Sequence, residues 1–480
     1  METERKIFAN TFVLTTGHGA AQLLNFLFVI YFARAFGVEA LGAYSFAISA
    51  ATIASVFVSF GSNSLALREI ARDPREETRL VGSLVPIQLC TGFLVFGVVT
   101  IVGKSFDLGG IAYGMLLLMA LSHVVMRWSG LIGARFGARE QMAYLSGAEA
   151  LRNLVRLLLG IAFISLFNDP VVAVGAFPIA SLLVYLWLYF ASTRSFGAPQ
   201  FSLSRLRAVA LAVAAWPYFS ILVLGVLYDR LGIIFLRAIQ SESAVGYFAS
   251  AERLIVPVGL LYTMFLSSVF PVLSRLTAQD EQAMDTLVAR CLRLLIVLTL
   301  PVGVLLYLFS ADIIAILFGQ EFGESAGVLR VAAWVFVIEG INGYFEVVAM
   351  ATGNAAIIAR VRFAALSIFV VVAIYLVNTM SYMGLISAIA IAEASIGIAL
   401  YAVLRTKVRS LRILRAGWRT AVASLVVLVA GLILRDQPLV LRLVTLTMIV
   451  IASMLAIGVV KRHDMRFLAA IAFPGRHSGS

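Results

Sequence analysis

The chain has 480 residues, of which 61% are hydrophobic and only 13% are charged, and its mean hydropathy is +1.00. Water-soluble domains contain about 45–50% apolar and about 25% charged residues, so this composition excludes a soluble globular protein. The formal net charge of +12 lies mainly in short segments between apolar runs, a pattern typical of membrane topology, and we therefore expect no nucleic-acid partner.

Apolar stretches long enough to cross a bilayer recur along the whole chain. About twenty apolar residues in a helix span the hydrocarbon core, whereas barrel strands would give short alternating segments, which are absent here. The sequence therefore predicts an all-α membrane protein with about fourteen transmembrane helices. The predicted spans are 10–34, 42–62, 81–103, 110–132, 144–167, 171–192, 209–236, 244–270, 292–310, 328–352, 359–378, 382–404, 418–434 and 439–460.

Basic residues alternate between the two sides of these predicted spans. Segments 67–80 ("LREIARDPREETRL"), 133–141 ("GARFGAREQ") and 404–419 ("LRTKVRSLRILRAGWR") fall on one side, together with the basic tail. Because positively charged loops stay in the cytoplasm, this bias places both termini there. We expect a multi-pass protein of the cell inner (plasma) membrane.

Two distant segments resemble each other, which indicates an internal repeat. Residues 34–47 ("RAFGVEALGAYSFA") and 237–251 ("RAIQSESAVGYFASA") each carry Arg-Ala, a glutamate five residues after the arginine, and then Gly and Tyr. Both fall between an odd span and the next even one, so the repeat predicts two pseudo-symmetric six-helix bundles. The predicted domains are residues 1–208, residues 209–404, and residues 405–480 with two additional helices and a cytoplasmic tail.

Polar side chains inside the predicted spans are the candidates for a substrate site. An ionisable residue at bilayer depth costs about 3 kcal/mol or more, so it normally faces a bundle interior or a watery cavity. The first span carries His18, Gln22 and Asn25 on one stripe, and the second continues that stripe with Ser45, Ser49 and Thr52. His123 and Arg127 lie one turn apart in span 110–132.

Charged residues continue in the later spans. Glu149, Arg152 and Arg156 share one helical stripe because they are spaced by three and four residues. The remaining charged candidates are Asp229, Arg230, Glu252, Arg253, Glu339, Glu346 and Glu393. We expect several of these faces to meet in a cavity shared by the two bundles.

Arginine in such a cavity favours an anionic cargo, because its planar guanidinium can hold phosphate through two hydrogen bonds. The predicted substrate-binding residues, for a diphosphate and its sugars, are Arg127, Arg152, Arg156, Arg230, Arg253, His18, Gln22 and Asn25. The acids either bind a coupling cation or proton, or form ion pairs with the arginines. These acids are Glu149, Asp229, Glu252, Glu339, Glu346 and Glu393.

Signatures of catalysis are missing from the sequence. The chain has no G-x-x-x-x-G-K-[ST] phosphate loop, no H-E-x-x-H and no G-x-S-x-G. Cys90 and Cys291 give neither a disulfide framework nor a metal-binding spacing. We therefore expect a transporter rather than an enzyme, without catalytic residues, metal or cofactor.

Four stretches of the chain carry recognisable motifs: "LNFLFVIYFARAFGVEALGAYSFAIS" (24–49), "LALREIARD" (65–73), "SAVGYFASAERLIVPVGLLYTMFLSSVFPVLSRL" (243–276) and "IIAILFGQEFGESAGVLRVAAW" (313–334). They resemble the multidrug/oligosaccharidyl-lipid/polysaccharide (MOP) exporter superfamily, most closely its polysaccharide flippase branch (Wzx-type, O-antigen or capsule transporters). The resemblance implies a V-shaped pair of six-helix bundles plus two extra C-terminal helices. It also implies flipping of polyprenyl-diphosphate-linked oligosaccharide to the outer leaflet, among membrane lipids and with glycan polymerase or ligase machinery as partner.

Two other functions compete with this interpretation. A cation- or proton-coupled multidrug exporter of the same superfamily would favour an acidic, aromatic cavity over an arginine-bearing one. A membrane glycan polymerase or ligase would need a large outer loop, and the outer loops predicted here are short. About fourteen spans resemble the lipid II flippase branch in number, but the first span has no arginine before Arg34 at its very end, which argues against a peptidoglycan precursor as cargo.

Overall fold

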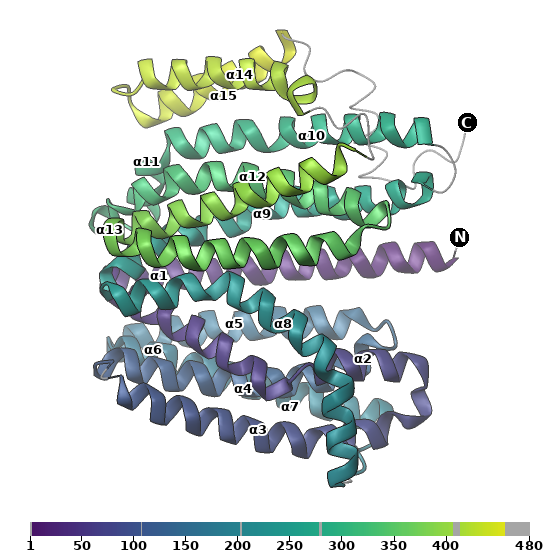
Figure 1. Cartoon of the computed structure of the whole chain (residues 1–480). Coiled ribbons are helices and arrows are strands. Elements are labelled where there is room, and N and C mark those ends of the chain that lie inside the picture. The colour runs from purple at the N-terminus through teal and green to yellow at the C-terminus, as the bar shows by residue number, and fades with distance from the viewer. Residues whose placement is uncertain (1, 107, 202–203, 278–280, 407–412, 457–480) are drawn as a thin grey trace. The chain divides into compact units, whose positions relative to one another are not determined.

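The computed structural model describes residues 2–106, 108–201, 204–277, 281–406 and 413–456 (Figure 1). Within these ranges the regular structure is helical, with two short 3-10 helices and no strand. In the described part of the chain, ten helices are long and apolar enough to cross a membrane, and two shorter apolar helices, Gly417–Ile433 and Leu439–Met454, follow them. The predicted all-α membrane fold is confirmed.

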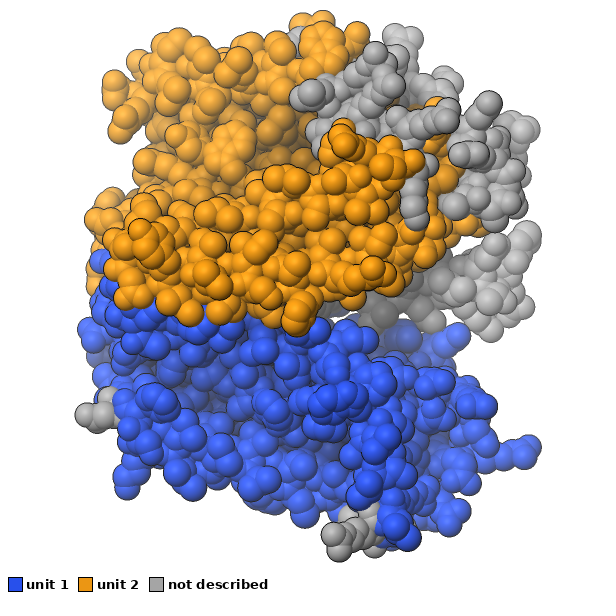
Figure 2. Space-filling model, viewed as in Figure 1, with its two compact units in different colours: residues 1–249 blue, residues 250–480 orange. Residues whose placement is uncertain are grey.

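The chain forms two units, residues 1–249 and 250–480 (Figure 2). The helices of unit 1 are α1 (Glu2–Ser59), α2 (Ser62–Arg72), η1 (Pro74–Glu76), α3 (Glu77–Ser105), α4 (Gly110–Gly137), α5 (Met142–Phe167), α6 (Pro170–Val174), α7 (Ala176–Phe196) and α8 (Arg205–Ile239). Helix α9 (Glu242–Thr277) begins in unit 1 and continues into unit 2. The other helices of unit 2 are α10 (Glu281–Leu308), α11 (Ser310–Leu317), η2 (Gln320–Phe322), α12 (Ser325–Ala351), α13 (Ala355–Leu404), α14 (Ile413–Ile433) and α15 (Leu439–Ala456). The predicted domain boundaries after residues 208 and 404 stay predictions.

Two of the long helices each contain two predicted spans. An unbroken 50-residue helix such as α13 would be about 75 Å long, far more than the roughly 30 Å hydrocarbon core. The backbone leaves helical geometry at Gly37 in α1 (φ 78°, ψ −170°) and at Ser381 in α13 (φ 52°, ψ −132°). These kinks lie where the sequence predicts breaks between spans. The end of the last predicted span and the tail, residues 457–480, lie outside the described residues.

Unit 1 is built around α1 and α4. Helix α1 packs against α4 and α5, and α4 packs against α7. The Phe28 ring lies 5.2 Å from the Phe177 ring and 6.2 Å from the Tyr44 ring, so α1 and α7 share an aromatic core. Gly160 of α5 makes room for this core, since a Cβ there would lie 2.3 Å from the Phe28 ring.

The two segments related by the sequence repeat touch each other within unit 1. A Cβ at Gly42 would lie 1.8 Å from the carbonyl oxygen of Glu242, and a Cβ at Gly246 would lie 2.1 Å from that of Val38. Each repeat therefore supplies a glycine where the backbone of the other repeat passes. This reciprocal contact explains why a glycine follows the glutamate in both copies.

Unit 2 packs α12 against α10 and α13. Helices α14 and α15 form a hairpin beside α10, and Figure 1 shows the two running together in yellow. Val304 and Phe309 from the α10 region, Val427 of α14 and Leu446 of α15 form the buried core of this contact. The two additional C-terminal helices are thus packed onto unit 2 through an apolar seam.

Candidate functional site

Four of the arginines predicted to bind substrate lie in one region of unit 1, and three of them surround His123. Arg127 of α4, Arg156 of α5 and Arg230 of α8 lie within electrostatic range of the His123 imidazole, and Arg152 lies within range of Arg156. Three different helices therefore contribute positive charge to one region. We call Arg127, Arg152, Arg156 and Arg230 the arginine cluster.

Helix α1 supplies hydroxyl groups to this region. Thr52 belongs to the predicted polar stripe, and Ser55, which was not predicted, lies three residues further along the same face. Thr52 Oγ1 lies 3.2 Å from His123 Nε2, and Ser55 Oγ accepts a 3.0 Å hydrogen bond from Arg127 Nε. His123 is buried, and its Nδ1 lies 2.9 Å from the Met119 carbonyl oxygen one turn back on α4.

Arg156 is positioned by weak contacts. Its two terminal nitrogens lie 3.4 Å from Asn153 Oδ1 and 3.4 Å from Ser181 Oγ, both at the long end of the hydrogen-bond range. The guanidinium carbon lies 4.7 Å from the centre of the Phe177 ring, a cation–π distance. Ser181 is held in turn by Ser122, with 2.9 Å between the hydroxyl oxygens. These groups orient Arg156 without neutralising it.

The stripe on α5 keeps unused donors and an excess of positive charge. The Nε atoms of Arg152 and Arg156 are buried and have no hydrogen-bond partner. Glu149 lies on the same stripe and acts electrostatically on both arginines, so one carboxylate faces two guanidinium groups. Because a buried donor without an acceptor is costly, such groups are suited to receive an anion.

The remaining predicted substrate residues have mixed placements. Gln22 and Asn25 lie partly buried in the first half of α1, and the side chain of His18 is outside what the structure describes. Asp229 is exposed beside Arg230 on α8. Glu252 and Arg253 are partly buried on α9 in unit 2, so their predicted meeting with the residues of unit 1 stays a prediction.

The acids of unit 2 fall into two groups. Glu339 of α12 accepts a 3.3 Å hydrogen bond from the Tyr262 hydroxyl, and the buried Glu393 accepts a 2.8 Å bond from Asn342. Both carboxylates act electrostatically on Tyr262. Glu346 instead forms an ion pair with Arg362, at 2.7 Å. The geometry of Glu346 thus matches the ion-pair alternative.

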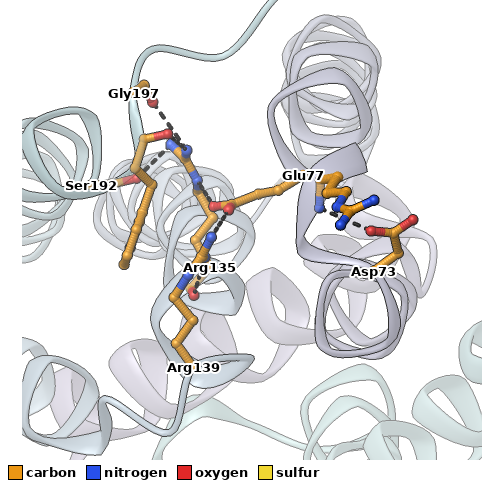
Figure 3. Close-up of polar contacts among 8 residues, drawn as sticks. Asp73, Glu77, Arg135, Arg139, Ser192 and Gly197 are labelled. Carbon is orange, nitrogen blue, oxygen red and sulfur yellow. Dashed lines mark hydrogen bonds and ion pairs between the residues drawn. The ribbon is translucent and has the colours of Figure 1, made fainter.

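A buried ion cluster at one end of unit 1 was missed by the sequence analysis, which assigned its residues to cytoplasmic loops. Glu77 begins α3 and Arg135 lies in the last turn of α4 (Figure 3). Their side chains are 2% and 0% exposed. Arg135 Nε and Arg139 Nη2 bind the two carboxylate oxygens of Glu77. The sequence contained a signal for this cluster. Arg135 and Arg139, four residues apart, follow the end of one predicted span, and Glu77 precedes the start of another. We call Glu77, Arg135 and Arg139 the Glu77 cluster.

The comparison with known families then identifies the chain. Residues 7–277 match the family described as "Polysaccharide biosynthesis protein". The chain belongs to this family. The predicted resemblance to a polysaccharide family is thereby confirmed. A search of curated protein sequences found no match.

Solved structures of transporters share the fold of this family member. A structure of "Lipid II flippase MurJ, inward closed conformation" aligns with a TM-score of 0.76 at 16% identity, covering 96% of this chain and 99% of that chain. An inward-facing "multidrug resistance MATE family transporter of the MOP superfamily" aligns at 0.64 and 17% identity, covering 82% and 95%. A MOP superfamily transporter from Pyrococcus furiosus aligns at 0.54 and 18% identity, covering 83% and 93%. The chain is therefore a multi-pass membrane protein with the fold of flippases and transporters.

Proposed function

We propose that this protein flips a polyprenyl-diphosphate-linked glycan from the cytoplasmic to the outer leaflet, by alternating access. The observation that carries the proposal is the arginine cluster, with its buried and unpartnered guanidinium nitrogens on α5. Buried guanidinium groups in a transporter fold are suited to bind the phosphate group of a lipid-linked substrate. Membership of a polysaccharide biosynthesis family supports a glycan as the remainder of the cargo.

The chemistry of the cluster favours a diphosphate over a neutral or cationic drug. A guanidinium group pairs with phosphate oxygens through two parallel hydrogen bonds, and charge-assisted bonds are about twice as strong as neutral ones. Arg152 and Arg156 offer such donors from one stripe, and Arg127 and Arg230 add charge from α4 and α8. A cationic drug would be repelled by these groups.

The other predicted site residues receive roles within this proposal. Arg253 of α9 is proposed to bind the head group later in the cycle, while His18, Gln22 and Asn25 contact the sugars. Glu149 limits the charge excess of the empty site. The protein would act in the cell inner (plasma) membrane with both termini in the cytoplasm, and would pass its glycan to polymerase or ligase machinery.

The test is a leaflet-resolved translocation assay in proteoliposomes with a fluorescent polyprenyl-diphosphate glycan. Wild type is compared with Arg156→Gln and with Arg194→Gln, which removes the same charge from an exposed site at the end of α7. We expect the glycan to reach the outer leaflet with wild type and Arg194→Gln, and to stay behind with Arg156→Gln. Equal movement with all three proteins would contradict the role of the cluster. Movement of cationic drugs but no glycan by wild type would favour a multidrug exporter.

A further inference from the structure

His123 has hydrogen-bond neighbours that do not suit a neutral imidazole. Its Nδ1 lies 2.9 Å from the carbonyl oxygen of Met119, which can only accept, so this nitrogen carries a proton. The other nitrogen, Nε2, lies 3.2 Å from Thr52 Oγ1. That hydroxyl has a single proton, which it donates to the Ile48 carbonyl oxygen at 2.6 Å.

The contact between Nε2 and Thr52 therefore lacks a proton when the imidazole is neutral. Two lone pairs then face each other, unless Thr52 gives up its bond to Ile48. In the imidazolium form, Nε2–H donates to Thr52, Thr52 donates to Ile48, and Nδ1–H donates to Met119. Every polar hydrogen of this buried group then has an acceptor, so the hydrogen bonds complement the charged form.

The surrounding charges oppose that form. Three positive charges act on the imidazole, from Arg127 on α4 itself, Arg156 on α5 and Arg230 on α8. The other neighbouring helices contribute neutral groups: α1 supplies the Thr52 hydroxyl, and α7 places Ser181 beside Arg156. Burial adds to the repulsion, because a cation loses hydration there. With the arginine cluster empty, the positive neighbours oppose the protonated form that the hydrogen bonds of His123 favour.

We infer that His123 takes up a proton when an anionic group occupies the arginine cluster. This inference rests on the proposed function, because it is the diphosphate that would reverse the sign of the field at the imidazole. The imidazolium then completes its bonds to Thr52 and Met119 and adds a fifth cation to the four arginines beside the substrate. Substrate binding and proton binding thereby become reciprocal, as linkage requires.

The sign of the pH dependence follows directly. There is a pH interval in which His123 is neutral in the free protein and protonated in the complex. Within this interval, ligand affinity increases as pH falls. For one linked proton the limiting slope is about tenfold in affinity per pH unit. Outside that interval the affinity is independent of pH.

The experiment measures proton uptake on ligand binding by the full-length protein in nanodiscs. The probe is a short-chain polyprenyl-diphosphate monosaccharide, in which both phosphates are esterified and remain fully ionised near neutral pH, so protons taken up come from the protein. Isothermal titration calorimetry in two buffers of different ionisation enthalpy gives the number of protons bound per ligand. Wild type is compared with His123→Gln, which retains a side-chain amide able to reach Thr52 but cannot titrate.

We expect uptake approaching about one proton per ligand in wild type and none in His123→Gln, which binds the probe with no pH dependence. Binding by wild type without proton uptake, or with the same uptake in both proteins, would overturn the role of His123 and leave the proposed diphosphate site standing. No binding by wild type at any pH would overturn both. The two failures are therefore distinguishable.

A second measurement avoids dependence on the variant's stability. The chain has four histidines, so ¹⁵N labelling of histidine gives a simple spectrum in which His123 is assigned by its loss from His123→Gln. The two ring nitrogens of a neutral imidazole have widely separated chemical shifts, and those of imidazolium converge. We expect convergence on addition of the probe, and an unchanged His123 signal in the saturated complex would refute the inference.

Discussion

Two sets of arginines in unit 1 share a helix and differ in how their charge is satisfied. Arg127 of the arginine cluster and Arg135 of the Glu77 cluster lie on α4, separated by about two turns, or about 12 Å along the axis. Arg135 donates to Glu77, to Ser192 at 2.7 Å, and to the carbonyl oxygens of Phe196 and Gly197 at 3.1 and 3.0 Å. Its guanidinium is nearly saturated.

The arginine cluster lacks this saturation. Arg156 makes two contacts of 3.4 Å, and its buried Nε has no partner. A buried cation with matched acceptors holds helices in place, whereas one left with spare donors and positive neighbours is ready for an anion. Burial of an arginine therefore does not by itself indicate a site; the number of its acceptors decides between a structural and a binding role.

The largest effect is expected from Glu77→Gln, which leaves Arg135 and Arg139 without their carboxylate. Removing one partner of a buried ion pair typically costs about 3–5 kcal/mol, because the remaining charge stays buried. We expect denaturant titration of the purified protein in micelles to show a free energy of unfolding that is lower than that of wild type by this amount.

The matched control is the neighbouring Glu76→Gln. Glu76 is 58% exposed and lies 3.8 Å from Arg207, so its loss should change the free energy of unfolding by less than about 1 kcal/mol. If both variants unfold alike, the Glu77 cluster contributes no special stability and the contrast between the two sets of arginines fails.

The next effect concerns transport rather than stability. Arg156→Gln removes a charge that has only weak partners, so we expect the free energy of unfolding to change by less than about 1 kcal/mol. Loss of a charge-assisted bond to the diphosphate is worth about 1.5–3 kcal/mol, or about 10- to 100-fold in affinity for the probe. Ligand titration together with denaturation separates the two quantities; a strongly destabilised Arg156→Gln would place this arginine with the structural ones.

The fold was largely predictable, because a long apolar segment that crosses a bilayer has few alternatives to forming a helix. The apolar runs located the spans, including the breaks near Gly37 and Ser381 where one continuous helix bends. The short helix α2 and the division of one predicted span into α6 and α7 were not predicted, since hydropathy does not register a bend at a membrane end. The repeat pointed to the glycine-bearing segments that touch in unit 1, but not to the contact itself, which depends on tertiary packing.

The candidate site was predictable in its composition and less so in its partners. Intramembrane arginines stand out in a sequence with few charges, and the structure places three of them near His123 and a fourth, Arg152, near Arg156. Ser55, Phe177 and Ser181 carry no signal of their own, because small polar and aromatic residues are common in spans. Arg135 was mistaken for a loop charge, because a helix end and a loop have the same basic composition and only burial distinguishes them.

A smaller effect should separate two serines that each accept a bond from an arginine of α4. Ser192→Ala leaves a fully buried donor of Arg135 unpaired, which should cost about 1–3 kcal/mol of stability. Ser55→Ala removes the acceptor of Arg127, whose side chain is only partly buried, so we expect a smaller loss. Unfolding of the two variants side by side checks the order, and a larger loss with Ser55→Ala would reverse the roles assigned to the two clusters.

The smallest effect is expected at the ion pair between Glu346 and Arg362 in unit 2. The Arg362 side chain is 48% exposed, and pairs of this kind contribute about 0–1 kcal/mol, so Glu346→Gln should leave the free energy of unfolding nearly unchanged. If Glu346 serves only this pair, glycan translocation and its dependence on the ion gradient should also match wild type. If translocation instead loses its dependence on a proton or sodium gradient, Glu346 belongs to the coupling machinery. The variant thus decides between the two roles that the sequence left open for this acid, and does so without the complication of a destabilised fold.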